Sequence, residues 1–178
     1  VAGGDRYFRG RTLHRLLELL PDIAPEKRIE AADRLLARLA PEIEEGERGQ
    51  WREEVMRVLT DPQFAEVFAP GSMAETPIVG RPRGLPASAR LNGQIDRLTV
   101  SESRVLVVDY KTNRPPPARV EDADSAYVAQ LAAYRALLQE IYPERQIVCA
   151  LLWTYDARLM DIPSEMLDHA FARMAKAG

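Results

Sequence analysis

The sequence predicts an α/β fold in which helices flank a mixed β-sheet and a helical extension precedes the sheet. Three observations support this prediction. Leucines recur at helical spacing near the start of the chain, from Leu13 to Leu20. Short strand-like runs follow from Met73 onward. A long helical segment then separates the first three of these runs from another apolar strand, which is the order expected when a parallel strand joins an antiparallel meander.

The N-terminal part is expected to contain three helices and a shorter fourth one. Their expected bounds are Arg9–Leu20, Pro25–Leu39 and Glu47–Leu59. Prolines punctuate this part, because proline is tolerated in the first turn of a helix and disfavoured further inside it. The pair Asp61-Pro62 combines a helix cap with a proline at the first helical position, so it predicts the short helix.

The remaining elements are expected to form the sheet and its covering helices. Strands are expected at Met73–Gly80, Arg90–Val100, Arg104–Lys111, Gln146–Thr154 and Arg158–Ile162, and helices at Ser125–Ile141, capped by Ser125, and Pro163–Lys176. A stiff proline-rich connector is expected over Arg114–Asp124. We expect residues 1–70 to form a helical part and residues 71–178 an α/β core, together one domain. Because the chain begins with Val1, we expect it to be a piece of a longer polypeptide.

Composition narrows the class of protein. The chain has 178 residues, 46% of them hydrophobic, which suits one domain with a real core. Its single cysteine, Cys149, excludes a disulfide framework and a four-cysteine metal site. No apolar run has the length of a membrane span and no signal peptide is visible, so an intracellular, cytoplasmic setting is expected.

The charge distribution favours contact with an anionic ligand. The formal net charge is −3, but residues 79–119 hold eight Lys/Arg and three Asp/Glu, a local charge of +5. Residues 1–78 and residues 120–178 each carry −4. Local charge steers an anion more than net charge does, so the middle segment is the one expected to face DNA. The alternative is a set of solvated arginines.

The most informative stretch is Gly93–Lys111, which reads as two strands joined by a polar turn. Alternation along the second strand puts Asp109 and Lys111 on the same face. Two carboxylates on neighbouring strands, Asp96 and Asp109, suit Mg²⁺ or Mn²⁺, and a lysine beside them suits phosphodiester hydrolysis. The alternative is a charge pair at the end of a strand.

Four other residues stand out, each with two interpretations. Gln130 and Tyr134 share one face of a helix and suit either a DNA-facing site or an ordinary amphipathic face. His14 is either a metal ligand or a histidine of the core, since leucines flank it. Glu75 is either a further acidic group near the metal or an exposed strand residue.

Taken together, the motifs resemble those of RecB-type nucleases of the PD-(D/E)xK superfamily, which have a restriction-endonuclease-like core. The matching segments, in order, are Gly10–His14, Glu75, Gly93–Arg97, Val108–Thr112 and Gln130–Tyr134. The string Asp109-Tyr110-Lys111-Thr112-Asn113-Arg114 looks most like the C-terminal nuclease domain of AddA-type helicase–nuclease subunits, which repair double-strand breaks.

The resemblance implies a role for each matching residue. It implies that metal is bound by His14, Asp96, Asp109 and the backbone carbonyl of Tyr110. It implies that Lys111 is the catalytic lysine, acting with Asp96 and Asp109. It also implies DNA binding or support of the site by Gln130, Tyr134, Glu75, Arg97, Thr112 and Arg114.

The function implied by the resemblance is that of a Mg²⁺- or Mn²⁺-dependent deoxyribonuclease. It would act on single-stranded ends fed by a helicase motor of the same parent chain, with an AddB-like partner subunit, in the bacterial cytoplasm near the nucleoid. One cysteine excludes the iron–sulfur branch of the family, and no Walker-type loop is present, so no ATP site is expected in this chain. The alternatives are a non-catalytic DNA-binding scaffold with the same fold and a stand-alone RecB-like or restriction-type enzyme.

Overall fold

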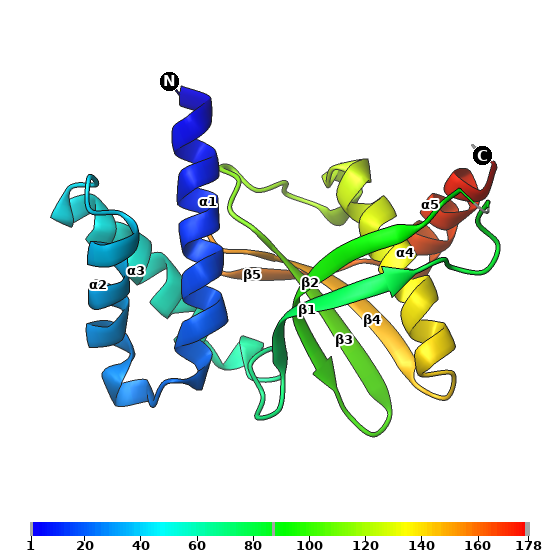
Figure 1. Ribbon diagram of the computed structural model, residues 1–178, viewed down its shortest axis with the longest axis horizontal. Helices are drawn as coiled ribbons and strands as arrows, with labels where there is room; N and C mark the ends of the chain where they lie inside the picture. The colour runs from blue at the N-terminus through cyan, green and yellow to red at the C-terminus, as the bar shows by residue number, and fades with distance from the viewer. Residues whose placement is uncertain (1, 87, 177–178) are drawn as a thin grey trace.

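The computed structural model describes residues 2–86 and 88–176, and a five-stranded sheet lies at its centre (Figure 1). The strands are β1 (Met73–Gly80), β2 (Leu91–Val100), β3 (Arg104–Lys111), β4 (Gln146–Trp153) and β5 (Arg158–Asp161), in that spatial order. β3 and β4 pair in parallel, and the other neighbours are antiparallel. The predicted mixed sheet is therefore confirmed.

Helices precede and follow the strands. The α-helices are α1 (Ala2–Leu19), α2 (Arg28–Leu39), α3 (Glu45–Thr60), α4 (Ser125–Ile141) and α5 (Ser164–Lys176). The 3-10 turns are η1 (Leu20–Asp22), η2 (Pro25–Lys27), η3 (Pro62–Phe64) and η4 (Val120–Asp122). α1 begins at Ala2, earlier than expected, because the leucine pattern that marked it covers only its second half. None of the described helices is long and apolar enough to cross a lipid bilayer.

The cap of α4 was predicted wrongly. The residue at its N-cap is Asp124, whose Oδ1 accepts a hydrogen bond from the Ala126 amide over 2.9 Å. Ser125 is instead the first residue of the helix. Both residue types cap helices well, but the carboxylate of Asp124 also interacts favourably with the positive end of the helix dipole.

Two hydrophobic cores lie on opposite faces of the sheet. Val105 and Val107 of β3 pack in the core beneath α4 and α5. Leu106, Val108 and Tyr110 pack in the other core, beneath α1, α2 and α3. This is the alternation that the sequence predicted for β3. Both groups of helices thus pack against β3. The C-terminal end of β3, with Asp109 and Lys111, lies where the two groups of helices meet.

Candidate metal centre and active site

The centre begins with an irregularity in β2 at Asp96. Ile95 packs in the core beneath α4, whereas Arg97, two residues later, bonds to the Leu17 carbonyl of α1. Residues two apart share a face in a regular strand, so β2 changes face at Asp96. Opposite Asp96 in β1, Glu75 has a φ of +48°, an uncommon conformation for a residue with a side chain. Backbone strain of this kind often marks a functional position.

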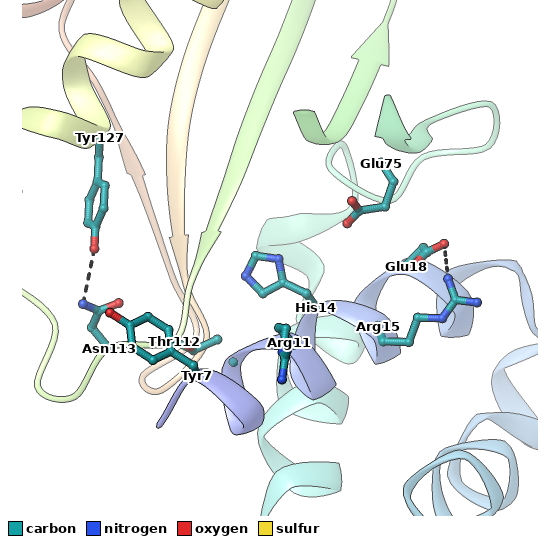
Figure 2. Close-up of a pocket in the computed structure, with 10 residues that line it drawn as sticks. Tyr7, Arg11, His14, Arg15, Glu18, Glu75, Thr112, Asn113 and Tyr127 are labelled. Atoms are coloured by element: carbon teal, nitrogen blue, oxygen red, sulfur yellow. Dashed lines mark hydrogen bonds and ion pairs between the residues drawn. The ribbon is translucent and has the colours of Figure 1, made fainter. Parts of the chain in front are cut away.

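This irregularity brings two carboxylates of the sheet to a histidine of α1. Ligand atoms of His14, Glu75 and Asp96 all lie within 4.8 Å of one another. The imidazole Nδ1 of His14 is 3.5 Å from Asp96 Oδ1, and the ring packs edge-on against Tyr110 with centroids 5.6 Å apart. His14 and Glu75 line a cleft of about 540 Å³, in which Figure 2 shows them turned toward each other.

Asp109 and Lys111 form the adjoining part of the centre. The Lys111 ammonium lies 2.5 Å from Oδ2 of Asp109. This Oδ2 is buried, and among the described residues its charge is paired with that ammonium. Asp109 is not one of the three tightly grouped residues, but its charge acts on both His14 and Asp96.

The electrostatics are those of a site crowded with negative charge. Burial alone would lower the pKa of His14, but its hydrogen bond to Asp96 and the charges of the surrounding carboxylates raise that pKa above its ordinary value. Burial, and then the charge of Asp96, raise the pKa of Asp109, and Lys111 offsets only part of this. Burial and Asp96 also raise the pKa of Glu75. A bound cation would relieve this repulsion.

The available donors suit a hard divalent cation. Carboxylate oxygens are the ligands that Mg²⁺ and Mn²⁺ prefer, and imidazole is a common additional ligand. The negative charge of the buried Asp109 Oδ2 is one that such a cation would share with the Lys111 ammonium. The part expected for the Tyr110 carbonyl stays a prediction.

The comparisons with known proteins identify the family. A model of the PD-(D/E)XK nuclease superfamily matches residues 3–170. The chain belongs to the PD-(D/E)XK nuclease superfamily. Membership implies phosphodiester hydrolysis as the activity. Nucleases of this superfamily use divalent metals. No curated protein matches the chain. A solved structure titled "Crystal structure of SSO0001" is similar at 9% identity and a TM-score of 0.38, over 96% of this chain and 84% of that one.

Tyr127, which sequence reasoning missed, contacts the lysine of this PD-(D/E)XK site, and Asn113 in turn bonds to Tyr127. The ammonium of Lys111 lies 3.6 Å from the centroid of the Tyr127 ring, a cation–π contact. The Tyr127 hydroxyl accepts a hydrogen bond from Asn113 Nδ2 over 3.3 Å, which Figure 2 shows at the end of the cleft away from Glu75. A sequence signal existed, because Tyr127 lies one helical turn before Gln130.

Gln130 and Tyr134 support β2 from α4. The Gln130 amide donates a hydrogen bond to the Tyr134 hydroxyl over 2.8 Å. This hydroxyl in turn donates to the Gln94 carbonyl over 3.3 Å. Gly93 leaves the space for it, because a Cβ there would lie 2.4 Å from the Tyr134 oxygen. Tyr134 is buried. Contact of Gln130, which is exposed, with DNA stays a prediction.

Arg97 does not face DNA, which corrects one of the two roles expected for it. The residue is buried. Its guanidinium donates to the Leu17 carbonyl over 2.7 Å and to the Tyr110 hydroxyl over 3.2 Å, and lies over the Phe68 ring. The change of face at Asp96 turns Arg97 inward, where it joins α1 to the sheet and so supports the position of His14.

The remaining two expected residues lie just beyond β3. Thr112 lines the cleft. Arg114 forms an ion pair with Glu54 of α3, and its guanidinium lies 4.9 Å from the centroid of the Tyr155 ring. Neither arrangement tests contact with DNA, which therefore stays a prediction for both.

Proposed function

We propose that this chain is a metal-dependent deoxyribonuclease domain that hydrolyses phosphodiester bonds of single-stranded DNA. The observation that carries the proposal is the convergence of His14 from α1, Asp96 from β2 and Glu75 from β1, with Asp109 and Lys111 beside them. This donor set suits a hard cation, and a cleft of about 540 Å³, lined in part by His14 and Glu75, adjoins it.

Each residue has a role in the proposed reaction. His14, Asp96 and Asp109 hold the cation, and Glu75 adds a third carboxyl group beside them. A bound divalent cation supplies a polarised phosphate and a more acidic water. Lys111 leaves its ion pair with Asp109 and donates to the phosphate oxygen on which negative charge develops. Tyr127 keeps the freed ammonium at the mouth of the cleft.

The proposed substrate and partners extend the resemblance to AddA-type domains. Single-stranded ends would be delivered by a helicase motor in the same parent chain, beside an AddB-like subunit, during repair of double-strand breaks. Two observations support this extension: the Asp109–Arg114 string and the local charge of +5 over residues 79–119. Such a charge attracts a polyanion from solution.

The proposal is tested by cleavage of end-labelled single-stranded DNA in Mg²⁺ or Mn²⁺, with chelator as the blank. Wild type should cut, Asp109→Asn should not, and Asp161→Asn, an exposed carboxylate of β5, should cut like wild type. A circular single strand as second substrate separates exonuclease from endonuclease. Equal background from wild type and Asp109→Asn, in this chain and in its parent complex, contradicts the proposal. Mn²⁺ calorimetry excludes a scaffold if wild type binds the ion and Asp96→Ala does not.

A further inference from the structure

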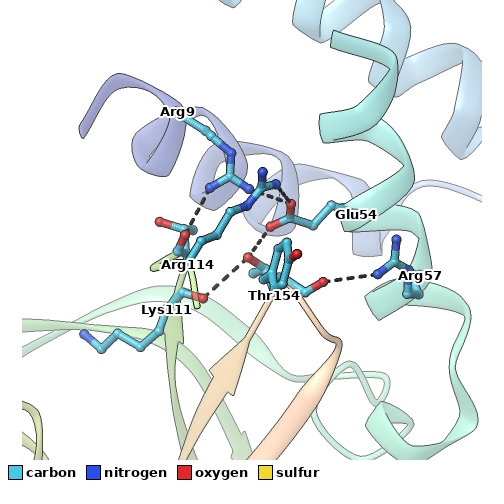
Figure 3. Close-up of polar contacts among 8 residues, drawn as sticks. Arg9, Glu54, Arg57, Lys111, Arg114 and Thr154 are labelled. Carbon is cyan, nitrogen blue, oxygen red and sulfur yellow. Dashed lines mark hydrogen bonds and ion pairs between the residues drawn. The ribbon is translucent and has the colours of Figure 1, made fainter. Parts of the chain in front are cut away.

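Glu54 of α3 holds together three segments that surround the centre. The side chain is 3% exposed, and its carboxylate accepts hydrogen bonds from Arg9 of α1, from Arg114 after β3 and from Thr154 after β4. The Arg9 and Thr154 contacts are both 2.5 Å long. These four residues, shown in Figure 3, are called the Glu54 clamp.

The clamp also reaches the backbone that follows the catalytic strand. Arg9 donates to the Thr112 carbonyl over 3.0 Å, and the Thr154 amide donates to the Lys111 carbonyl over 3.0 Å. Burial alone would raise the pKa of Glu54, but the Thr154 hydroxyl and the nearby arginines hold it below its ordinary value. Glu54 is therefore a carboxylate at neutral pH, and it offsets the charge of two guanidinium groups.

The clamp adjoins the cleft, because Arg9 precedes Gly10 and bonds to Thr112, and both of these residues line the cleft. α1 approaches β3 closely at Gly10, where a Cβ would lie 3.0 Å from Thr112 Oγ1. Gly10 and Thr112 line the cleft, whereas none of the clamp residues is among the described lining residues. One turn after Gly10, α1 presents His14 to Asp96. The distance between His14 and Asp109 therefore depends on how α1 is held at the end of β3.

We propose that Glu54 is a positioning residue that holds α1 against the end of β3, so that His14 keeps its place beside Asp96 and near Asp109 for metal binding. This inference rests on the proposed nuclease function. Without the carboxylate, the guanidinium groups of Arg9 and Arg114 repel each other, and Arg9, whose side chain is 12% exposed, loses the partner that offsets the cost of its burial. We expect α1 and the segment after β3 then to separate. The metal-ligand side chains on α1 and β3 would no longer reach the same ion.

The test compares Glu54→Gln, which keeps the shape but removes the charge, with Glu53→Gln, the exposed neighbour on α3. Mn²⁺ binding is measured by calorimetry, and cleavage is measured as a function of Mn²⁺. Glu54→Gln should bind Mn²⁺ about tenfold more weakly, the lower end of the loss caused by removing a direct partner of a metal ligand, because Glu54 acts through the position of α1. Its KM for DNA should stay at the wild-type value, and saturating Mn²⁺ should restore kcat. Glu53→Gln should match wild type.

A purely structural role predicts a different pattern. In that case Glu54→Gln melts at a lower temperature but, while folded, binds Mn²⁺ like wild type, and this result overturns the inference. If Glu54→Gln does not fold, Thr154→Val removes one clamp hydrogen bond at constant volume, with exposed Thr60→Val as its control. Thr154→Val should bind Mn²⁺ roughly threefold more weakly than wild type. An unchanged Mn²⁺ affinity in this variant overturns the inference.

The outcome for the clamp is separable from the outcome for the nuclease function. Mn²⁺ titration requires no cleavage. A wild-type protein that binds Mn²⁺ and cuts no DNA contradicts the proposed function and leaves the comparison of Glu54→Gln with Glu53→Gln valid. A wild-type protein that cuts DNA, with a Glu54→Gln variant of unchanged Mn²⁺ affinity, contradicts only the clamp.

Discussion

The carboxylate of Asp96 accepts a hydrogen bond from the backbone amide of Tyr110, with 2.6 Å between Oδ2 and N. The residues of β2 that pair with β3 run from Arg97 to Val100. Just beyond the last backbone pair, the side chain of Asp96 therefore provides the hydrogen bond between the two strands. The other oxygen of Asp96 faces His14. One carboxylate thus joins β3 to α1 at the centre.

Asp96→Asn is expected to abolish activity without unfolding the protein. The amide oxygen of asparagine still accepts from Tyr110, but the charge that holds a cation is gone. Cleavage should fall by at least 100-fold, about 3 kcal/mol of transition-state stabilisation. Melting in chelator should occur at or above the wild-type temperature, because the repulsion on Asp109 is reduced. A strongly lowered melting temperature would instead give Asp96 a structural role.

Lys111→Met is expected to change rate and metal affinity in opposite directions. The ammonium lies 2.5 Å from Asp109 Oδ2 and competes with a cation for that oxygen. Its removal should tighten Mn²⁺ binding threefold to tenfold, about 1 kcal/mol, while kcat falls by about 100-fold. Calorimetry and single-turnover cleavage measure the two quantities. Lys176→Met on α5 is the control, and weaker Mn²⁺ binding by Lys111→Met argues against competition.

Tyr127 is expected to act through its ring rather than through its hydroxyl. Tyr127→Phe keeps the face over which Lys111 lies and should retain most of kcat. Tyr127→Leu removes it and should lower kcat threefold to tenfold, in line with a cation–π contact of about 1 kcal/mol. Mn²⁺ affinity should be the same in both variants. Equal rates for phenylalanine and leucine would show that the ring has no such role.

Gly93→Ala is expected to destabilise the fold from within β2. The new methyl group would lie 2.4 Å from the Tyr134 hydroxyl oxygen and 2.7 Å from a ring carbon. Overpacking of this kind costs about 1–3 kcal/mol in urea unfolding. Adding Tyr134→Phe should recover only part of the loss, because the ring carbon is still too close. Gly49→Ala, inside α3 and with no atom within 4 Å of its new methyl, should stabilise the fold by about 0.5–1 kcal/mol.

Without metal, stability is expected to fall as pH rises from weakly acidic values. The folded-state pKa values of Glu75, Asp109 and His14 are raised, so the folded protein binds more protons than the unfolded chain. Where that holds, the unfolding free energy decreases with pH. The loss begins above the ordinary carboxyl values and continues above 6.5, where His14 loses its proton. Glu54 has the opposite effect. Because its pKa is lowered in the folded protein, its contribution to stability is lost only as the pH falls into the acidic range.

With saturating Mn²⁺ the pH dependence should reverse, because the cation binds the deprotonated groups. Melting curves from pH 5 to 9 in chelator and in Mn²⁺ measure both trends. His14→Gln should remove the decline above pH 6.5 in chelator. A decline of the same size in that variant would assign it to another group.

The fold was largely predictable because its signals are local. The two-faced strand Arg104–Lys111 and the apolar strand after a long helix predict a mixed sheet between two cores, and the structure has both. The cap at Asp124 was missed because neighbouring Asp and Ser are both good caps. The choice between them depends on backbone angles that the sequence does not show.

The candidate site was predictable only in part. The resemblance singled out His14, Glu75 and Asp96, which the structure brings together. Their ligand roles stay predictions. The burial of Arg97 depends on the change of face at Asp96, which no strand pattern reveals. Glu54 was missed because its partners lie 45, 60 and 100 positions away, so that in the sequence it is one of several glutamates on a helix.

The Glu54 clamp also bears on the order in which the protein becomes active during synthesis. Thr154 follows β4, so the clamp is complete only when the chain has been made beyond Trp153. A chain stopped before Gln146 contains every residue expected to hold metal, but it lacks β4, the parallel neighbour of β3. We therefore expect the centre to assemble only after β4 has been made and has paired with β3.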